Sequence, residues 1–193
     1  MSPAIPILLA LGLGLIGWLA ARGRAWTLRK VARAGGGELH SLPNYHGWYV
    51  ALWAAVPATI FAIAWASLSP ALVLDKVLAD PAAGALPAFG IQRDAILAEA
   101  QAIASGSTAI AFNPKSAALV EPFRAAMGQF SIIGILVTLL LGFAGGAYAF
   151  LRLRPDFTAR TRVEQVVMGG LLVASLVAIF TTFGILASLL FET

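Results

Sequence analysis

The chain has 193 residues, of which 60% are apolar and only 11% are charged, whereas a soluble domain has about 25% charged residues. This composition excludes an ordinary soluble domain, and the absence of cysteine excludes disulfides and thiolate metal sites. The net charge of +4 does not indicate a nucleic-acid partner, because the basic residues gather in short stretches between apolar runs.

Four uncharged stretches are each long enough to cross a bilayer, which takes about 20 apolar residues in a helix. They predict an all-α integral membrane protein with transmembrane helices at residues 4–21, 48–68, 130–150 and 166–190. We expect two helical hairpins with a mainly helical extracytoplasmic segment between them, which gives three parts: 1–68, 69–129 and 130–193. No Asp, Glu, Lys, Arg or His lies within the spans, which argues against a proton-coupled transporter or a charge-lined channel made by this chain alone.

The first predicted helix has one feature of a signal peptide, since "WLAARG" (18–23) resembles a small-residue cleavage site. A signal peptide carries its positive charge before the apolar core, and here the charge follows it, which favours a retained helix. Within this helix "GLGLIG" (12–17) matches the GxGxxG pattern of dinucleotide-binding proteins. That pattern requires a preceding strand and a following amphipathic helix, so these glycines indicate close helix contact instead.

Basic residues in the two short connections set the predicted orientation. Short basic loops mark the cytoplasmic side, so the N-terminus, the middle segment and the C-terminus should lie on the extracytoplasmic side of the membrane. The first connection has two interpretations: a basic helix on the anionic inner leaflet, or charges that only set the topology. The basic residues are Arg22, Arg24, Arg29, Lys30 and Arg33 in the first connection and Arg152, Arg154, Arg160 and Arg162 in the second.

Both histidines lie in "ELHSLPNYHGWYV" (38–50), where His40 and His46 are six residues apart. A zinc site usually has three or four ligands at a recognisable spacing, and only Glu38 is nearby, so no metal site is predicted. Proline, asparagine and glycine punctuate this stretch, which predicts re-entry into the membrane at the cytoplasmic interface. Its aromatic residues suit the headgroup level: Tyr45, Trp48 and Tyr49.

The middle segment contains one predicted helix, at residues 91–104, with Gly106 suited to its C-terminal cap. Its apolar residues form too small a core for an autonomous domain, so we expect a lid or arm on the outer surface. Three dipeptides mark breaks in the chain or the start of the stretch that leads into the third span: Asp80-Pro81, Asn113-Pro114 and Glu121-Pro122.

Small residues recur every four positions in the third and fourth spans. Such stripes allow two helix backbones to approach closely in lipid, and the short connection between these helices makes them antiparallel neighbours in this interpretation. The alternative is that glycine and alanine are simply common in this sequence. We favour a helix-packing face made of Gly134, Thr138, Gly142 and Gly146 in the third span and Gly170, Ala174, Ala178 and Thr182 in the fourth.

Two longer stretches carry a family resemblance. "LHSLPNYHGWYVALWAAVPA" (39–58) resembles part of the N-terminal extension of C-type inner-membrane permeases of bacterial phosphate-import ABC transporters. "RPDFTARTRVEQVVMGGLLVASLVAIFTTFGILASLLFET" (154–193) resembles the segment that leads into their first core helix. The weak helix "AILAEAQAIASG" (95–106) belongs to the same resemblance, which spans most of the chain. These residues are not a substrate motif, so no phosphate-contacting residue is assigned.

The sequence departs from that family in one respect. Family members continue through several more core helices and carry a cytoplasmic coupling loop of the EAA type, and neither short loop here contains one. The resemblance implies a non-enzymatic, cofactor-free part of a phosphate importer permease. Its expected partners are the bilayer, other membrane subunits, an ATPase and a binding protein, but no nucleic acid. The alternative is a structural accessory subunit, derived from such a permease and docked on another large membrane complex.

Overall fold

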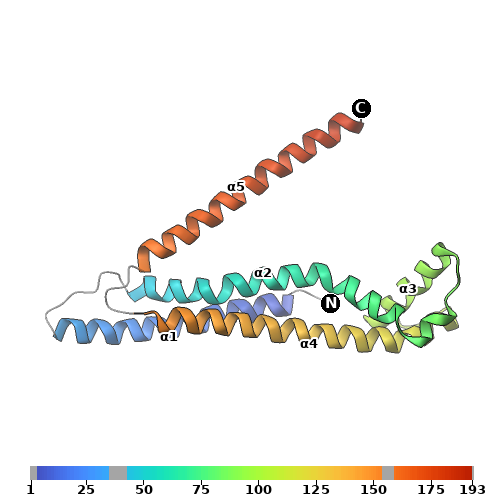
Figure 1. Ribbon diagram of the computed structural model, residues 1–193, viewed down its shortest axis with the longest axis horizontal. Helices are drawn as coiled ribbons and strands as arrows, with labels where there is room; N and C mark the ends of the chain where they lie inside the picture. The colour runs from blue at the N-terminus through green and yellow to red at the C-terminus, as the bar shows by residue number, and fades with distance from the viewer. Residues whose placement is uncertain (1–3, 35–42, 154–158, 193) are drawn as a thin grey trace. The chain divides into compact units, whose positions relative to one another are not determined.

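The computed structural model describes residues 4–34, 43–153 and 159–192, and every regular element in these ranges is a helix (Figure 1). Four of the helices are long and apolar enough to cross a membrane, so the predicted all-α class with four apolar helices of spanning length is confirmed. The elements are α1 (Ala4–Ala34), α2 (Pro43–Leu78), the short 3-10 helix η1 (Pro81–Ala85), α3 (Gly90–Ala104), α4 (Pro114–Leu151) and α5 (Ala159–Glu192).

The apolar helices extend beyond the stretches that their uncharged residues predict. α1 continues through part of the basic connection to Ala34, and α2 continues from the predicted end at residue 68 to Leu78. α4 begins at Pro114, so the expected helix start at Glu121-Pro122 was wrong, and Pro122 lies inside the helix. A charged residue ends an apolar run without ending a helix, because arginine, lysine and glutamate are all good helix formers.

Two of the predicted breaks are confirmed as capped helix starts. Asp80 accepts a hydrogen bond from the backbone N–H of Ala82 at 2.9 Å, and Asn113 accepts one from the backbone N–H of Lys115 at 3.0 Å. The proline that follows each of them occupies the first helical position, where the missing amide hydrogen costs nothing. η1 and α4 therefore both start with a side-chain cap followed by proline.

The C-terminal cap predicted for α3 is also confirmed. Gly106 has a φ of +81°, a conformation that other residues adopt only with strain. Its backbone N–H donates to the carbonyl of Ile103 at 3.0 Å, and the N–H of Ser107 donates to the carbonyl of Ala102 at 2.9 Å. These two bonds form a Schellman motif, which satisfies the last carbonyls of the helix.

Contacts within the chain define two compact units, and each is described by itself. The first unit consists of Met1–Leu13 and Ala54–Ala144, and the second consists of Gly14–Trp53 and Gly145–Thr193. The first unit contains η1, α3 and most of α4, and the second unit contains α5.

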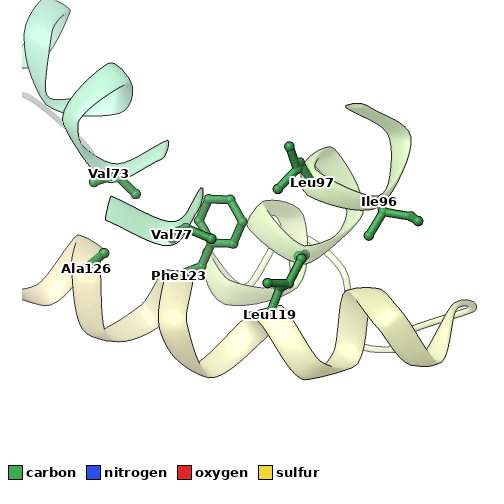
Figure 2. Close-up of a cluster of buried hydrophobic side chains, with 8 residues drawn as sticks. Val73, Val77, Ile96, Leu97, Leu119, Phe123 and Ala126 are labelled. Atoms are coloured by element: carbon green, nitrogen blue, oxygen red, sulfur yellow. The ribbon is translucent and has the colours of Figure 1, made fainter. Parts of the chain in front are cut away.

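The core of the first unit lies where three elements meet: the last turns of α2, the whole of α3 and the first turns of α4. We call this region, residues 73–126, the helical cap, which is distinct from the capping residues at the helix ends. In Figure 2 the ring of Phe123 rises from α4 toward Val77 of α2 and Leu97 of α3. Phe123 and Leu119 are fully buried, and each such side chain contributes about 1.5–3 kcal/mol when it leaves water. The remaining buried members are Val73, Ile96, Ala100 and Ala126.

Glu99 attaches the loop 105–113 to α3. Its Oε1 accepts hydrogen bonds from the backbone N–H groups of Phe112 at 2.5 Å and Asn113 at 3.4 Å. The bond from Phe112 lowers the pKa of Glu99 below its usual value, with smaller effects of the same sign from Ser116 and Asn113, while desolvation acts in the opposite direction. The carboxylate also lies close to the start of α4, where the helix dipole favours negative charge.

Phe123→Ala should open the helical cap, because removing a buried aromatic ring costs about 3–5 kcal/mol. We expect faster tryptic cleavage at Arg93 and Lys115 of the purified chain in mild detergent. Phe89→Ala is the matched control, since Phe89 is exposed and lies outside the cluster. Equal cleavage rates for the two variants would contradict the assignment of Phe123 to the core of the cap.

Glu99 should make the attachment of the loop dependent on pH. Because its folded pKa is lowered, its contribution is fully present above the unfolded-state pKa of about 4.3. The contribution is lost as the pH falls through the still lower folded pKa. Hydrogen exchange at the amides of Phe112 and Asn113, corrected for the intrinsic rate, should lose protection on acidification in the wild type. A variant with Glu99→Gln should show a much weaker dependence, and identical pH profiles for the two proteins would refute this role.

Candidate functional site

In the described residues the structure shows close helix contacts at several glycines and exposed arginines that lie over aromatic rings. Among the residues that the structure describes, no group of three or more His, Asp or Glu side chains could hold a metal ion. His40 lies outside the described residues, and His46 is fully buried on α2. Gly47 also lies inside α2 and does not interrupt it.

Gly134 of α4 lies against the indole of Trp65 of α2, in the first unit. A Cβ added at Gly134 would overlap the Trp65 ring. The close approach lets Trp65 Nε1 donate to the backbone carbonyl of Phe130 at 3.1 Å. The same indole stacks on Phe61, with ring centroids 5.7 Å apart. Glycine at this position therefore allows the Trp65 indole of α2 to reach the main chain of α4.

Gly142 of α4 is the second close contact in the first unit. A Cβ added there would lie 2.7 Å from Leu13 Cδ1 and 3.4 Å from the backbone oxygen of Ala54. Between the two glycines, Thr138 is fully buried and donates to the carbonyl of Gly134 at 2.7 Å. Of the stripe predicted on α4, Gly134 and Gly142 thus lie at close contacts and Thr138 is buried, while Gly146 is half-buried.

The predicted stripe on α5 lies on an exposed helix surface. In the described part of α5, Val163 is buried, Ala187 is half-buried and the other side chains are exposed. A Cβ added at Gly170 would meet nothing within 4 Å, and Ala174 and Ala178 are exposed. Thr182 donates to the carbonyl of Ala178 at 2.9 Å, which satisfies its hydroxyl inside the helix. The pairing of the α4 and α5 stripes stays a prediction.

α1 and α2 meet through two reciprocal glycine contacts in the second unit. Gly17 of α1 faces Val50 of α2, whose Cγ1 would lie 3.1 Å from an added Cβ. Gly47 of α2 faces Trp18 of α1, whose Cδ1 would lie at 2.8 Å. The expectation that the "GLGLIG" glycines make close helix contact is therefore confirmed at Gly17 and wrong at Gly12, which meets nothing within 4 Å.

Three arginines near the ends of uncharged stretches lie over aromatic rings in the second unit. The distances from the guanidinium carbon to the ring centroid are 5.0 Å for Arg22 over Trp18, 4.9 Å for Arg24 over Phe150 and 4.6 Å for Arg152 over Tyr148. Each distance falls within the roughly 6 Å limit of a cation–π interaction. The structure thus brings Arg152 into the same unit as the predicted interface residues Arg22 and Arg24.

The other predicted interface residues are less uniformly placed. Arg29, Lys30 and Arg33 lie on α1, but their side chains are outside the described set. Tyr45 is half-buried, Trp48 is exposed and packs edge-on against Trp18, and Tyr49 is buried and lies edge-on to Trp53. The aromatic residues therefore combine interior packing with exposed rings.

Helices with uncharged stretches of spanning length, several of them joined through glycine contacts, define a multi-span membrane protein. The model of the family described as "Phosphate ATP-binding cassette transporter" matches residues 5–181, so the chain belongs to that family. No curated protein matches the chain, and no solved structure matches it. The family match begins in α1 and continues into α5.

Gly142→Leu should destabilise the first unit, because a leucine would need space that Leu13 and the Ala54 carbonyl occupy. The side chain of Leu13 can turn aside, but the main chain of α2 cannot, so we expect a loss of about 1–3 kcal/mol. The measurement is the thermal unfolding midpoint in mild detergent. Gly170→Leu is the matched control, since it meets open space on α5. A midpoint lowered equally in both variants, or in neither, would contradict the packing role of Gly142.

Proposed function

We propose that this chain is a non-catalytic, membrane-embedded part of a phosphate ABC importer permease. It would correspond to the N-terminal extension and the first core helix of the C-type subunit. The observation that carries this proposal is the family match over residues 5–181, which includes all the helices from α1 to α4 and most of α5. The resemblance of residues 39–58 and 154–193 to C-type permeases supports the choice of subunit.

The uncharged spans support a packing role rather than a translocation role. Phosphate is an anion, and an anion that crosses a low-dielectric interior requires opposite charge or hydrogen-bond donors along its path. The span stretches contain no charged side chain. Thr138, Thr181 and Thr182 each donate their hydroxyl hydrogen to a carbonyl of their own helix. In this proposal the phosphate path lies on other permease helices.

The proposal places the helical cap on the extracytoplasmic side of the inner membrane and both short basic connections on the cytoplasmic side. The N-terminus and the C-terminus then lie on the extracytoplasmic side, and the spans form two hairpins. The asymmetric distribution of basic residues supports this orientation. Packing of α5 against other permease helices and lipid is part of the same proposal, since its described apolar side chains other than Val163 and Ala187 are exposed.

Single cysteines can test the orientation, because the chain has no cysteine of its own. Thr108 lies in the loop of the helical cap and Thr161 lies near the start of α5, and both are exposed. Thr108→Cys should react with a membrane-impermeant thiol reagent in intact spheroplasts. Thr161→Cys should react only after the membrane is opened. The opposite labelling pattern would overturn the orientation.

Co-purification tests membership of the importer. The tagged full chain, purified in mild detergent from its native membrane, should retain the other permease subunit and the ATPase of the phosphate importer in fixed ratio. Gly84→Ala in η1 is a control for extraction, since that position meets open space and does not lie on a helix of spanning length. Recovery of a different membrane complex in fixed ratio, without the importer ATPase, would replace this proposal with the accessory-subunit alternative.

A further inference from the structure

The helical cap carries exposed apolar side chains that lipid does not account for. Every other large apolar side chain that is exposed in the described residues lies on a helix of spanning length. The exceptions lie at the start of α3 and in the loop 105–113. They are Phe89, exposed to 76%, Ile91, to 89%, Ile110, to 67%, and Phe112, to 86%. A purpose other than contact with acyl chains is needed for them.

A cavity of about 320 Å³ lies between the start of α3 and the start of α4. Phe89 and Ile91 are sequence neighbours of its lining on α3, and Phe112 directly precedes its lining on α4. The backbone N–H of Phe112 is bound by Glu99, which also lines the cavity. We call Phe89, Ile91 and Phe112 the apolar rim, and exposed apolar side chains around a hollow are typical of a protein-docking surface. The lining includes Pro87, Gln92, Glu99, Asn113 and Lys115.

The apolar rim lies in water rather than in lipid. α4 has 38 residues, which is about 57 Å of helix, whereas a hydrocarbon core is about 30 Å thick. All the charged residues of α4, Lys115, Glu121 and Arg124, precede residue 125, so the start of α4 projects from the bilayer. From Pro114 to the predicted start of the span at residue 130 is about 24 Å, and a headgroup layer adds only about 5–8 Å to the core. The rim therefore faces a protein and not the bilayer.

The polar side chains of the cavity leave one positive charge without a partner. Glu99 accepts hydrogen bonds from the backbone N–H groups of Phe112 and Asn113, so its charge is satisfied inside the cap. Lys115 is exposed, and no carboxylate in the described part of the chain is paired with its ammonium group. A carboxylate of the partner complements this lysine, and an apolar side chain complements the rim. The polar lining favours a partner that binds reversibly, since permanent interfaces are more apolar.

We propose that the apolar rim and its cavity form the surface on which the soluble binding protein of the phosphate importer docks. The binding protein places an apolar side chain in the cavity and a carboxylate beside Lys115. This inference rests on the proposed function, which supplies the partner and puts the helical cap on the extracytoplasmic side. Of the other partners expected for an importer, the ATPase lies on the opposite side of the membrane and the permease helices lie within it.

The test uses the complex that co-purifies with the tagged full chain, reconstituted in lipid nanodiscs, and the purified, phosphate-loaded binding protein. Biolayer interferometry gives the dissociation constant and the association rate. Phe89→Ser with Phe112→Ser should weaken binding about tenfold, because buried aromatic side chains carry much of the affinity of an interface. Both side chains are exposed in the chain alone, so the cap should keep its fold. Phe89→Leu with Phe112→Leu keeps the rim apolar and should retain most of the affinity.

A charge reversal tests the second contact. Lys115→Glu should slow association about fivefold at low salt, because a charge at the edge of an interface acts mainly on the association rate. Arg124→Glu is the matched control, since it makes the same change of charge at an exposed position of α4 that does not line the cavity. This control should associate at close to the wild-type rate.

Three results would overturn the inference. The first is equal affinity of the wild type and the serine variant, and the second is equal slowing by the two charge reversals. The third is protection of Phe112→Cys from an impermeant thiol reagent before the binding protein is added, which would mean that a permease subunit or a second copy already covers the rim. Any of these with the importer ATPase present in the complex overturns this inference alone. A complex without the ATPase overturns the proposed function, and this inference with it.

Discussion

The space that a few glycines leave for side chains of a neighbouring helix is the constraint on which the rest of the structure depends. Lipid chains are as apolar as leucine, so burial gives no driving force for helix association inside a membrane, and contact must come from van der Waals packing and hydrogen bonds. In the first unit Gly134 and Gly142 provide that contact against Trp65 and Leu13. In the second unit Gly17 and Gly47 do so against Val50 and Trp18. Where no such contact exists, as at Gly170, the helix surface is exposed.

Polar groups in the spans must find hydrogen-bond partners within the protein, because an unsatisfied hydrogen-bonding group in hydrocarbon costs several kcal/mol. Thr138 donates to a carbonyl of its own helix, and Trp65 donates to a carbonyl of the neighbouring one. The cross-helix bond is available only because Gly134 has no side chain. Gly134 therefore provides both the space for the Trp65 ring and access to a carbonyl acceptor for its N–H. The hydrogen bond itself is the smaller contribution, because such bonds in membrane proteins average only about 0.6 kcal/mol.

Sequence reasoning predicted the features that depend on local chemistry. Uncharged stretches indicated the four apolar helices, and the capped starts at Asp80 and Asn113 and the glycine cap at Gly106 followed from side-chain chemistry and backbone freedom. The features it missed depend on which side chain faces which. Gly47 was interpreted as punctuation, whereas it provides the space that Trp18 fills. Spacing within one helix identifies a face that can pack, but the partner depends on the register between helices, which no single sequence pattern encodes.

The helical cap and the glycine contact at Gly134 join the same two helices of the first unit, α2 and α4. The cap core uses Val73 and Val77 of α2 and Leu119 and Phe123 of α4. The same two helices meet at Trp65 and Gly134. In the proposed topology, burial of apolar surface from water holds α2 and α4 together at the cap, and steric fit holds them together within the span. Because α2 continues through residue 68 and α4 through residue 130 without a break, the cap fixes the register that the glycine contact requires.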